Sequence, residues 1–443
     1  MSRDDKRNMQ QSAASLDQQD ERQQAESDLP QHIAKDNPQA ASDLSERIVE
    51  DKQEVAHDLL EHTVEDEQQK AAAALYQAES DEQRQQEQEQ DIEPPVSSPV
   101  ADTHQRYSRQ ELFTPLGREG QQQLLQSTVL IIGAGALGSS SAETLVRAGV
   151  GRVIIADRDY VEWSNLQRQQ LFTEQDAAHR VPKAIAARDR LRQINSTVQI
   201  EAHIADVTAD EIEEWVDGVD LIMDATDNFE TRLLINDISQ KHRIPWIYGG
   251  CVGSYGITFT IVPGVTPCLQ CLMESAPLGG DTCDTSGIIP PAVQMVVAHQ
   301  TTEALKLLSG HSEQLRGTLL SFDLWRNEQV SIKMNSARRT GCPSCGEHPT
   351  YPHLSHEGQS KSEVLCGRDT VQIRPAQRQQ LDLPQTARRL RGQSEHDVTV
   401  NPFLLSMTLH EGRRMVVFQD GRVMVHGTKD IAEARTIYHR YFG

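Results

Sequence analysis

The sequence predicts an α/β fold, in which a mostly parallel sheet carries helices on both faces. Residues 128–157 read TVLIIGAGALGSSSAETLVRAGVGRVIIAD, which is a β-branched strand, a glycine-rich turn, a helix and a second strand. The run VDLIMDATDN is another apolar strand, and it ends in carboxylates. Strands that alternate with helices in this way indicate crossover units and a parallel sheet. Because the turn has the spacing Gly-x-Gly-x-x-Gly, we expect this sheet to be Rossmann-like.

The N-terminal part of the chain holds most of its negative charge. The 443 residues carry a net charge of −22, and residues 1–100 contain 9 Lys and Arg against 25 Asp and Glu, a balance of −16. This Gln-rich composition does not bury enough apolar surface to offset its ordering entropy. We therefore expect a disordered extension over 1–103, closed by the linker EPPVSSPV. Residues 44–59 have helical spacing of apolar side chains, which is typical of a transient solvated helix or of a docking helix.

Composition also bounds the compartment and the partners. No basic block stands out, so we expect no nucleic-acid surface. No apolar run approaches the roughly 18 residues of a membrane span. The N-terminus MSRDDKRNMQQ lacks the apolar core of a signal peptide, so we expect a cytoplasmic protein without membrane partners.

The glycine-rich turn predicts a nucleotide. Gly133, Gly135 and Gly138 follow the first strand directly, where glycines let backbone N–H groups and a helix N-terminus approach a phosphate. Asp157 ends the second strand, where a carboxylate can accept hydrogen bonds from ribose hydroxyls. At this point the kind of nucleotide, NAD included, stays open.

The next segment favours a nucleoside triphosphate. The run DRDYVEWSNLQRQQLFTEQDAAHRVPKA places Arg168 and Lys183 downstream of the ribose carboxylate, with Asn165 and Gln169 nearby. A triphosphate needs more positive charge than a dinucleotide whose phosphates lie on the glycine turn, and an Arg fork with a Lys point charge supplies it. The alternative is that both cations lie on the surface of an ordinary helix.

The strand in VDLIMDATDN ends in two carboxylates. Asp224 and Asp227 lie at its carboxyl end, where ligands of parallel sheets bind. A carboxylate there can hold Mg²⁺ that bridges phosphates. Alternatively, Asp227 or Asn228 caps the following helix, FETRLLINDISQKH.

Four of the seven cysteines form two Cys-x-x-Cys pairs. Cys268 with Cys271 and Cys342 with Cys345 would give four thiolates for tetrahedral Zn²⁺, and four protein ligands make a site structural. The 70 residues between the pairs mean that the metal would join distant parts of the chain. A redox dithiol is the alternative. We expect Cys251 to be a small buried side chain, and Met295 and His299 to serve packing.

Seven motifs occur together and in order over residues 104–348: RYSRQ, GAGALG, DRDYVEWSNLQRQ, PKA, DATDN, PCLQC and CPSCG. This set resembles the ThiF/MoeB/HesA family of ubiquitin-activating-type adenylyltransferases, in particular ThiF/MoeB proteins of Firmicutes. The resemblance implies ATP-dependent adenylation of the C-terminal glycine of a ubiquitin-like sulfur carrier, ThiS-like or MoaD-like, with release of pyrophosphate. The pathway would be thiamine thiazole or molybdopterin biosynthesis. The implied cofactors are ATP, Mg²⁺ and Zn²⁺.

The resemblance also implies roles for single residues. Asp157 matches the ribose-binding carboxylate, Arg168 and Lys183 the phosphate cations, and Asp227 the magnesium ligand. Arg109 matches an arginine that a partner subunit inserts into its neighbour's ATP site, which implies a homodimer. The remaining candidates for nucleotide binding are Gly133, Gly135, Ala136 (a position often held by Gly), Gly138, Ser164, Asn165 and Asn228.

Cys283, in GGDTCDTSGIIPP, lies outside both cysteine pairs. It matches a cysteine that, in the ThiF branch, is implicated in a covalent link to the carrier during sulfur transfer. A cysteine desulfurase is then a further partner. The alternative is a small side chain in a crossover loop.

The chain beyond the core domain, which we expect over 104–350, predicts a small α+β module over 351–443. RRMVVFQDGRVMVHG is a hairpin with an Asp-Gly turn at 420–421, TKDIAEARTIYHRY a helix that starts near Thr428, and VLCGRDTVQI a further strand. The resemblance assigns this module no catalytic role. Its Cys366 could relay sulfur or be a structural thiol.

Two other functions remain open. One is an NAD(P)-dependent oxidoreductase, which Arg168, Lys183 and the cysteine pairs disfavour. The other is a non-catalytic scaffold stabilised by zinc, in which the acidic extension would be the working part.

Overall fold

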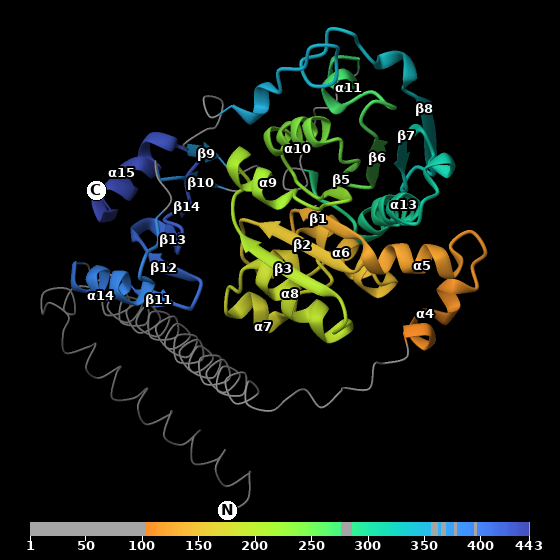
Figure 1. Ribbon diagram of the computed structural model, residues 1–443. Helices are drawn as coiled ribbons and strands as arrows, with labels where there is room; N and C mark the ends of the chain where they lie inside the picture. Colours follow the sequence, from red (N-terminus) through yellow and green to blue (C-terminus); the bar gives the residue numbers. More distant parts are fainter. Residues whose placement is uncertain are drawn as a thin grey trace, which may run out of the picture. The chain divides into compact units, whose positions relative to one another are not determined.

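The computed structural model of this chain describes residues 103–275, 286–355, 362–364, 369–375, 379–393 and 397–442 (Figure 1). All of them belong to one compact unit, which spans 94–443. The expectations for the acidic extension up to residue 102, for the helix at 44–59, for Cys283 and for Cys366 concern residues outside this set. Within the described set, no helix is long and apolar enough to cross a membrane.

The larger sheet of the described residues has the strand order β3-β2-β1-β4-β5-β6-β7-β8. The first five strands in this order are parallel, and each further neighbour is antiparallel. The order changes direction between β1 and β4, which is where ligands bind in open α/β sheets. The strands are β1 (Thr128–Ile132), β2 (Arg152–Asp157), β3 (Gln199–Ile204), β4 (Leu221–Asp224), β5 (Trp246–Val252), β6 (Tyr255–Ile261), β7 (Thr318–Asp323) and β8 (Glu328–Lys333).

Helices cover both faces of the parallel part, as the apolar strands predict. In β1, Val129 and Ile131 join the core cluster beneath α6 and α8, while Leu130 and Ile132 join the cluster beneath α9 and α10. The α-helices are α4 (Thr103–Glu111), α5 (Gly117–Gln126), α6 (Ala136–Ala148), α7 (Glu174–Ala178), α8 (Lys183–Ile194), α9 (Ala209–Trp215), α10 (Phe229–His242), α11 (Leu269–Ser275) and α13 (Pro290–Leu308). Short 3₁₀ turns are η1 (Trp163–Asn165), η2 (Ser312–Gln314), η3 (Asn335–Ala337), η4 (Pro352–Leu354) and η6 (His410–Gly412).

A second sheet follows in the chain, with the order β11-β12-β13-β14-β10-β9. All of its pairings are antiparallel. Its elements are β9 (Ser362–Val364), β10 (Thr370–Ile373), α14 (Leu383–Gln393), β11 (Val398–Val400), β12 (Leu404–Thr408), β13 (Arg414–Phe418), β14 (Val423–His426) and α15 (Ile431–Phe442).

Two details of this second sheet differ from the sequence expectation. In the run VLCGRDTVQI, residues 364–373, the expected strand is β10 and takes only the last four residues, while Val364 ends a separate strand, β9. The last helix begins at Ile431, because the Asp430 carboxylate accepts a hydrogen bond from the Ala432 amide at 2.8 Å and so caps the helix. Thr428 instead accepts the Asp430 amide at 3.0 Å. The expected hairpin is present as β13 and β14, with Gly421 at φ +86° in its turn.

Candidate functional site

Glycines shape the turn between β1 and α6. Gly133 has φ +97°, and a Cβ there would lie 2.5 Å from the Ala225 carbonyl oxygen. A Cβ at Gly138 would lie 1.8 Å from the carbonyl oxygen of Gly133. At Gly135, by contrast, the nearest neighbour of a Cβ would be Gln169 Nε2 at 3.9 Å. Two glycines are therefore needed for close packing, and the third leaves space beside the helix N-terminus.

Among the described residues, that helix N-terminus has no side-chain cap. Its N-cap is Gly135, which has no side chain to accept a hydrogen bond from the first turn. The N-terminal amides of a 13-residue helix and its dipole attract an anion such as phosphate. Ala136, the first helical residue, packs its methyl group against the apolar cluster around Leu137. An alanine is thus compatible with this position.

Asp157 joins the glycine turn to the loop after β2. Its carboxylate accepts the amide of Ala134 at 2.6 Å and the amide of Asp159 at 2.7 Å. Burial raises the pKa of Asp157, an effect that the nearby Lys183 ammonium opposes. The carboxylate therefore lies at the end of β2 beside the turn, as a ribose-binding group requires.

Two buried amide side chains near the turn hold polar atoms without partners. Asn165 and Gln169 are 1 % and 3 % exposed. Asn165 Oδ1 accepts the Glu162 amide at 3.0 Å, but Asn165 Nδ2 and Gln169 Oε1 have no hydrogen-bond partner among the described residues. Buried polar atoms are nearly always paired in folded proteins. These two atoms, beside an uncapped helix, fit a polar ligand.

The two predicted phosphate cations differ in environment. Lys183 begins α8, is 3 % exposed, and places its Nζ 3.1 Å from Asp159 Oδ2. It is therefore not a surface cation on an ordinary helix. Arg168 is half-buried, and its Nη1 donates to the carbonyl of the exposed Ser164 at 2.8 Å. Asp159 was not among the site residues predicted from the sequence, although its position two residues after Asp157 could have indicated it.

At the end of β4 the two carboxylates have separate environments. Asp224 is fully buried and pairs with Arg232, whose Nε lies 3.0 Å from Asp224 Oδ2. Arg232 Nη2 also donates to the carbonyls of Thr226 at 2.7 Å and Gly249 at 3.0 Å. Asp224 therefore joins β4 to α10 and β5. No local pattern in the sequence marks Arg232, which follows Asp224 by eight residues and is the fourth residue of the next helix.

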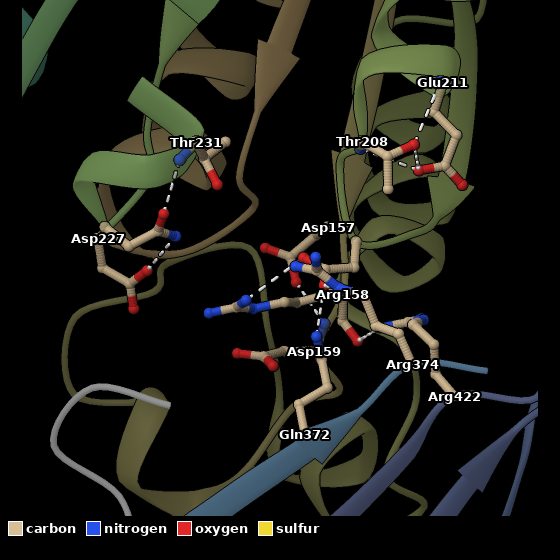
Figure 2. Close-up of polar contacts among 12 residues, drawn as sticks. Asp157, Arg158, Asp159, Thr208, Glu211, Asp227, Thr231, Gln372, Arg374 and Arg422 are labelled. Carbon is tan, nitrogen blue, oxygen red and sulfur yellow. Dashed lines mark hydrogen bonds and ion pairs between the residues drawn. The ribbon is translucent and has the colours of Figure 1, made fainter. Parts of the chain in front are cut away.

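Asp227 is exposed, and Asn228 is the helix cap. Asn228 Oδ1 accepts the Thr231 amide at 2.8 Å, while Asn228 Nδ2 donates to Asp227 Oδ1 at 3.4 Å (Figure 2). Of the two cap candidates, Asn228 takes this role. The Asp227 carboxylate stays accessible to a cation and to solvent.

Arg109 lies apart from these groups in sequence, on α4. Its side chain is exposed and makes no hydrogen bond or ion pair with the side chain of another described residue. Its position therefore gives no direct contact with the glycine turn of its own chain.

The four predicted metal-ligating cysteines come together. Their sulfur atoms all lie within 4.8 Å of one another, and Cys268, Cys271 and Cys342 are buried. Cys271 lies in the first turn of α11. Hydrogen bonding with Cys268 lowers the pKa of Cys345 to about 5, while burial raises that of Cys271 to about 11. Full ionisation of four adjacent thiols needs a cation, and a Cys₄ set at this spacing fits Zn²⁺.

Comparison with known proteins gives the family. Residues 107–344 match the model described as the ThiF family. The chain belongs to the ThiF family. It is 55 % identical over 338 residues to the sulfur carrier protein ThiS adenylyltransferase of Bacillus subtilis, covering 76 % of this chain and 99 % of that protein. This agrees with the resemblance to Firmicutes members of the family.

Two more distant relatives share the core but a smaller part of this chain. The ThiS adenylyltransferase of Escherichia coli is 38 % identical over 54 % of this chain and 94 % of its own length. The SAMP-activating enzyme E1 of Haloferax volcanii is 39 % identical over 55 % of this chain and 88 % of its own length. The ThiF-family core is thus common to all three relatives.

The two carboxylates after β4 give a first prediction. Asp224→Ala leaves the Arg232 guanidinium buried without its partner, which costs about 3–5 kcal/mol of unfolding free energy. Asp227→Ala removes an exposed side chain and should change that free energy by less than about 0.5 kcal/mol. Urea unfolding followed by circular dichroism measures both. Equal losses in the two variants would contradict the separate environments described above.

The cysteine cluster gives a second prediction. The purified protein should contain one zinc ion per chain by elemental analysis, and a strong chelator should lower its melting temperature because thiolates at this spacing repel without a cation. Cys342→Ser should do the same without chelator. Cys251→Ser, outside the cluster, serves as the matched control. A metal-free protein with an unchanged melting temperature would rule out a structural zinc site.

Proposed function

We propose that this ThiF-family protein adenylates the C-terminal glycine of a ThiS-type sulfur carrier with ATP and releases pyrophosphate. The observation that carries the proposal is the pair of unpartnered buried atoms, Asn165 Nδ2 and Gln169 Oε1, beside the uncapped N-terminus of α6. Asp157 and the buried Lys183 complete a set of groups suited to ribose and phosphates. The similarity to the ThiS adenylyltransferases of Bacillus subtilis and Escherichia coli supports ThiS as the carrier and thiamine thiazole as the pathway.

The chemistry of adenylation fits these groups. A carboxylate that attacks the α-phosphorus is repelled by the triphosphate, so cations are needed to neutralise the charge that develops on the phosphates. Lys183, Arg168 and the α6 N-terminus supply positive charge or dipole on this chain. Asp227 would hold Mg²⁺, which when bound neutralises phosphate charge. The attacking carboxylate is already ionised near pH 7, so no general base is required.

The other two functions have less support. A dinucleotide-dependent oxidoreductase would not need a buried lysine paired with a carboxylate next to the ribose site, since hydride transfer develops no phosphate charge. A scaffold stabilised by zinc would not need unpartnered buried amide atoms beside a helix N-terminus. Neither function is that of the relatives from Bacillus subtilis, Escherichia coli and Haloferax volcanii.

Pyrophosphate exchange tests the function. With ThiS of Bacillus subtilis present, labelled pyrophosphate should return to ATP, and Asp227→Ala should slow this about a hundredfold, as for loss of one electrostatic contact to a transition state. Glu230→Ala, an exposed carboxylate three residues away, is the matched control and should keep full exchange. Exchange that is absent from the wild type with ThiS and with MoaD would overturn the proposal. Exchange with MoaD alone would move it to molybdopterin synthesis.

We infer that the enzyme acts as a homodimer in which Arg109 enters the partner's ATP site. Arg109 is exposed on α4, and the turn that follows this helix exposes Leu112 and Phe113 by 71 % and 64 %. Large apolar side chains that are exposed together are typical of contact surfaces. An interface at this turn would bring Arg109 next to a second copy of the chain.

Hybrid dimers test this arrangement. Neither Arg109→Ala nor Asp227→Ala should support exchange alone, but an equimolar mixture should recover about a quarter of the wild-type activity, since half of the dimers then hold one intact site. Subunit exchange is verified with two affinity tags. Mixed dimers that stay inactive would contradict the shared site.

We further propose that Cys283 forms a covalent link to the carrier after adenylation, with a cysteine desulfurase as the source of sulfur. The Cys283 thiolate would attack the carbonyl carbon of the acyl-adenylate, forming a thioester and releasing AMP before water hydrolyses the adenylate. Adenylation itself uses charge neutralisation and needs no thiol, so the two steps are separable.

A further inference from the structure

The second sheet packs one face on its own helices and the other face on the loop after β2 and the end of β3. Leu405, Val417 and Val423 belong to the core cluster that also contains Leu390 of α14 and Ala434 of α15. Residues that alternate with these, among them Val416, Phe418 and Met424, cluster with Tyr160 and Ile204. Tyr160 follows β2 and Ile204 ends β3. The second sheet therefore contacts the carboxyl ends of the strands that lead to the nucleotide site.

Asp206 is the polar centre of this contact. It follows the end of β3, where the Ala205 amide donates to the Asp157 carbonyl at 3.1 Å. Its carboxylate is 4 % exposed and accepts hydrogen bonds from Arg158, at 3.3 Å, and from Gln372 and Arg374 of the second sheet (Figure 2). Burial opposes ionisation of Asp206, but three guanidinium groups, of Arg158, Arg374 and Arg422, outweigh it and lower the pKa of this carboxyl.

Arg422 ties the same two strand ends through their main chain. Its Nη1 donates to the Arg158 carbonyl at 3.3 Å and its Nη2 to the Ile204 carbonyl at 3.5 Å. The guanidinium lies 4.5 Å from the centre of the Phe418 ring and bonds Asp420 at 2.6 Å, so its direction is fixed. Arg422 thus fixes the main chain at Arg158, the residue that follows Asp157.

A second group of contacts fixes the loop after β2 farther along the chain, at Tyr160 and Glu162. Tyr160 Oη lies 3.0 Å from His426 Nε2 and accepts a hydrogen bond from Arg414 Nη2 at 2.8 Å. Arg414 also pairs with Glu162 at 3.4 Å, and the Glu162 amide donates to Asn165 Oδ1. The second sheet therefore contacts the loop on both sides of Asp159, the partner of Lys183.

We propose that Arg374, Gln372 and Arg422 are positioning residues for the bound nucleotide. They touch no reacting group themselves. They hold Arg158 and Asp206, and with them the segment 157–162, in the conformation that presents Asp157 to ribose and Asp159 to Lys183. This inference rests on the proposed function, because it names how the same ATP site is held in place.

Arg374→Ala in the full-length chain is the main test. It removes one donor to Asp206, and we expect the dissociation constant and the KM of ATP to rise about tenfold while kcat and the KM of ThiS change less than about twofold. Arg374→Lys, which keeps the charge, should restore most of the affinity. The matched control is Arg389→Ala, because Arg389 is an exposed residue of α14 that contacts Tyr441 and Phe442, and its loss should leave the affinity for ATP unchanged.

Tyr160→Phe is the second variant, because it keeps the packing and removes only the hydroxyl that meets His426 and Arg414. A rise of about threefold in the dissociation constant of ATP is expected, and this variant decides the matter if Arg374→Ala does not fold. A purely structural role for the second sheet would lower the active fraction, and so kcat, without changing the affinity for ATP.

Unchanged ATP affinity in folded Arg374→Ala and Tyr160→Phe, with wild-type exchange present, would overturn the positioning role alone. ATP binding by the wild type without carrier-dependent exchange would overturn the proposed function alone. Calorimetry measures the affinity for ATP without the carrier, so this measurement is independent of the exchange assay.

Discussion

The candidate site depends on one carboxylate. Asp157 accepts main-chain hydrogen bonds from Ala134 in the glycine turn before α6 and from Asp159 in the loop after β2, so it joins two segments that are separate in sequence. The amide of Ala205 then bonds the Asp157 carbonyl and attaches the end of β3 to the same point. Loops at the carboxyl edge of a parallel sheet are not held by the hydrogen bonds between strands. Here the side chain and the carbonyl group of Asp157 hold these loops in place.

The sequence predicted those parts that depend on local pattern. Apolar runs placed β1, β2 and β4, and the glycine spacing placed the turn, because each follows from a few adjacent residues. The FETRLLINDISQKH helix begins and ends as expected, since Asn228 caps it locally. The cysteine cluster was predictable across 70 intervening residues because metal ligation imposes a distinctive spacing within each pair.

Long-range pairings were not predictable from the same patterns. Asp224 and Asp227 look alike in sequence, and only the burial of Arg232 against Asp224 separates a structural carboxylate from an accessible one. Likewise, Asp206 lies 166 residues before Gln372 and 168 before Arg374, and no periodicity in the sequence predicts the contact between them. Contacts between sheets depend on the relative placement of whole elements, which a single sequence leaves unspecified.

The cysteine cluster also has a topological consequence. A metal ion bound to all four sulfur atoms closes a covalent and coordinate ring that contains α13, β7 and β8. Ring closure over this length removes about 4 kcal/mol of chain entropy from the unfolded state, if metal closure is treated like a disulfide of the same span. A single backbone cut within the ring would still leave both pieces joined through the metal. Antiparallel strands at that edge of the sheet would then stay at high local concentration, so the sheet could re-form after partial opening without a bimolecular search.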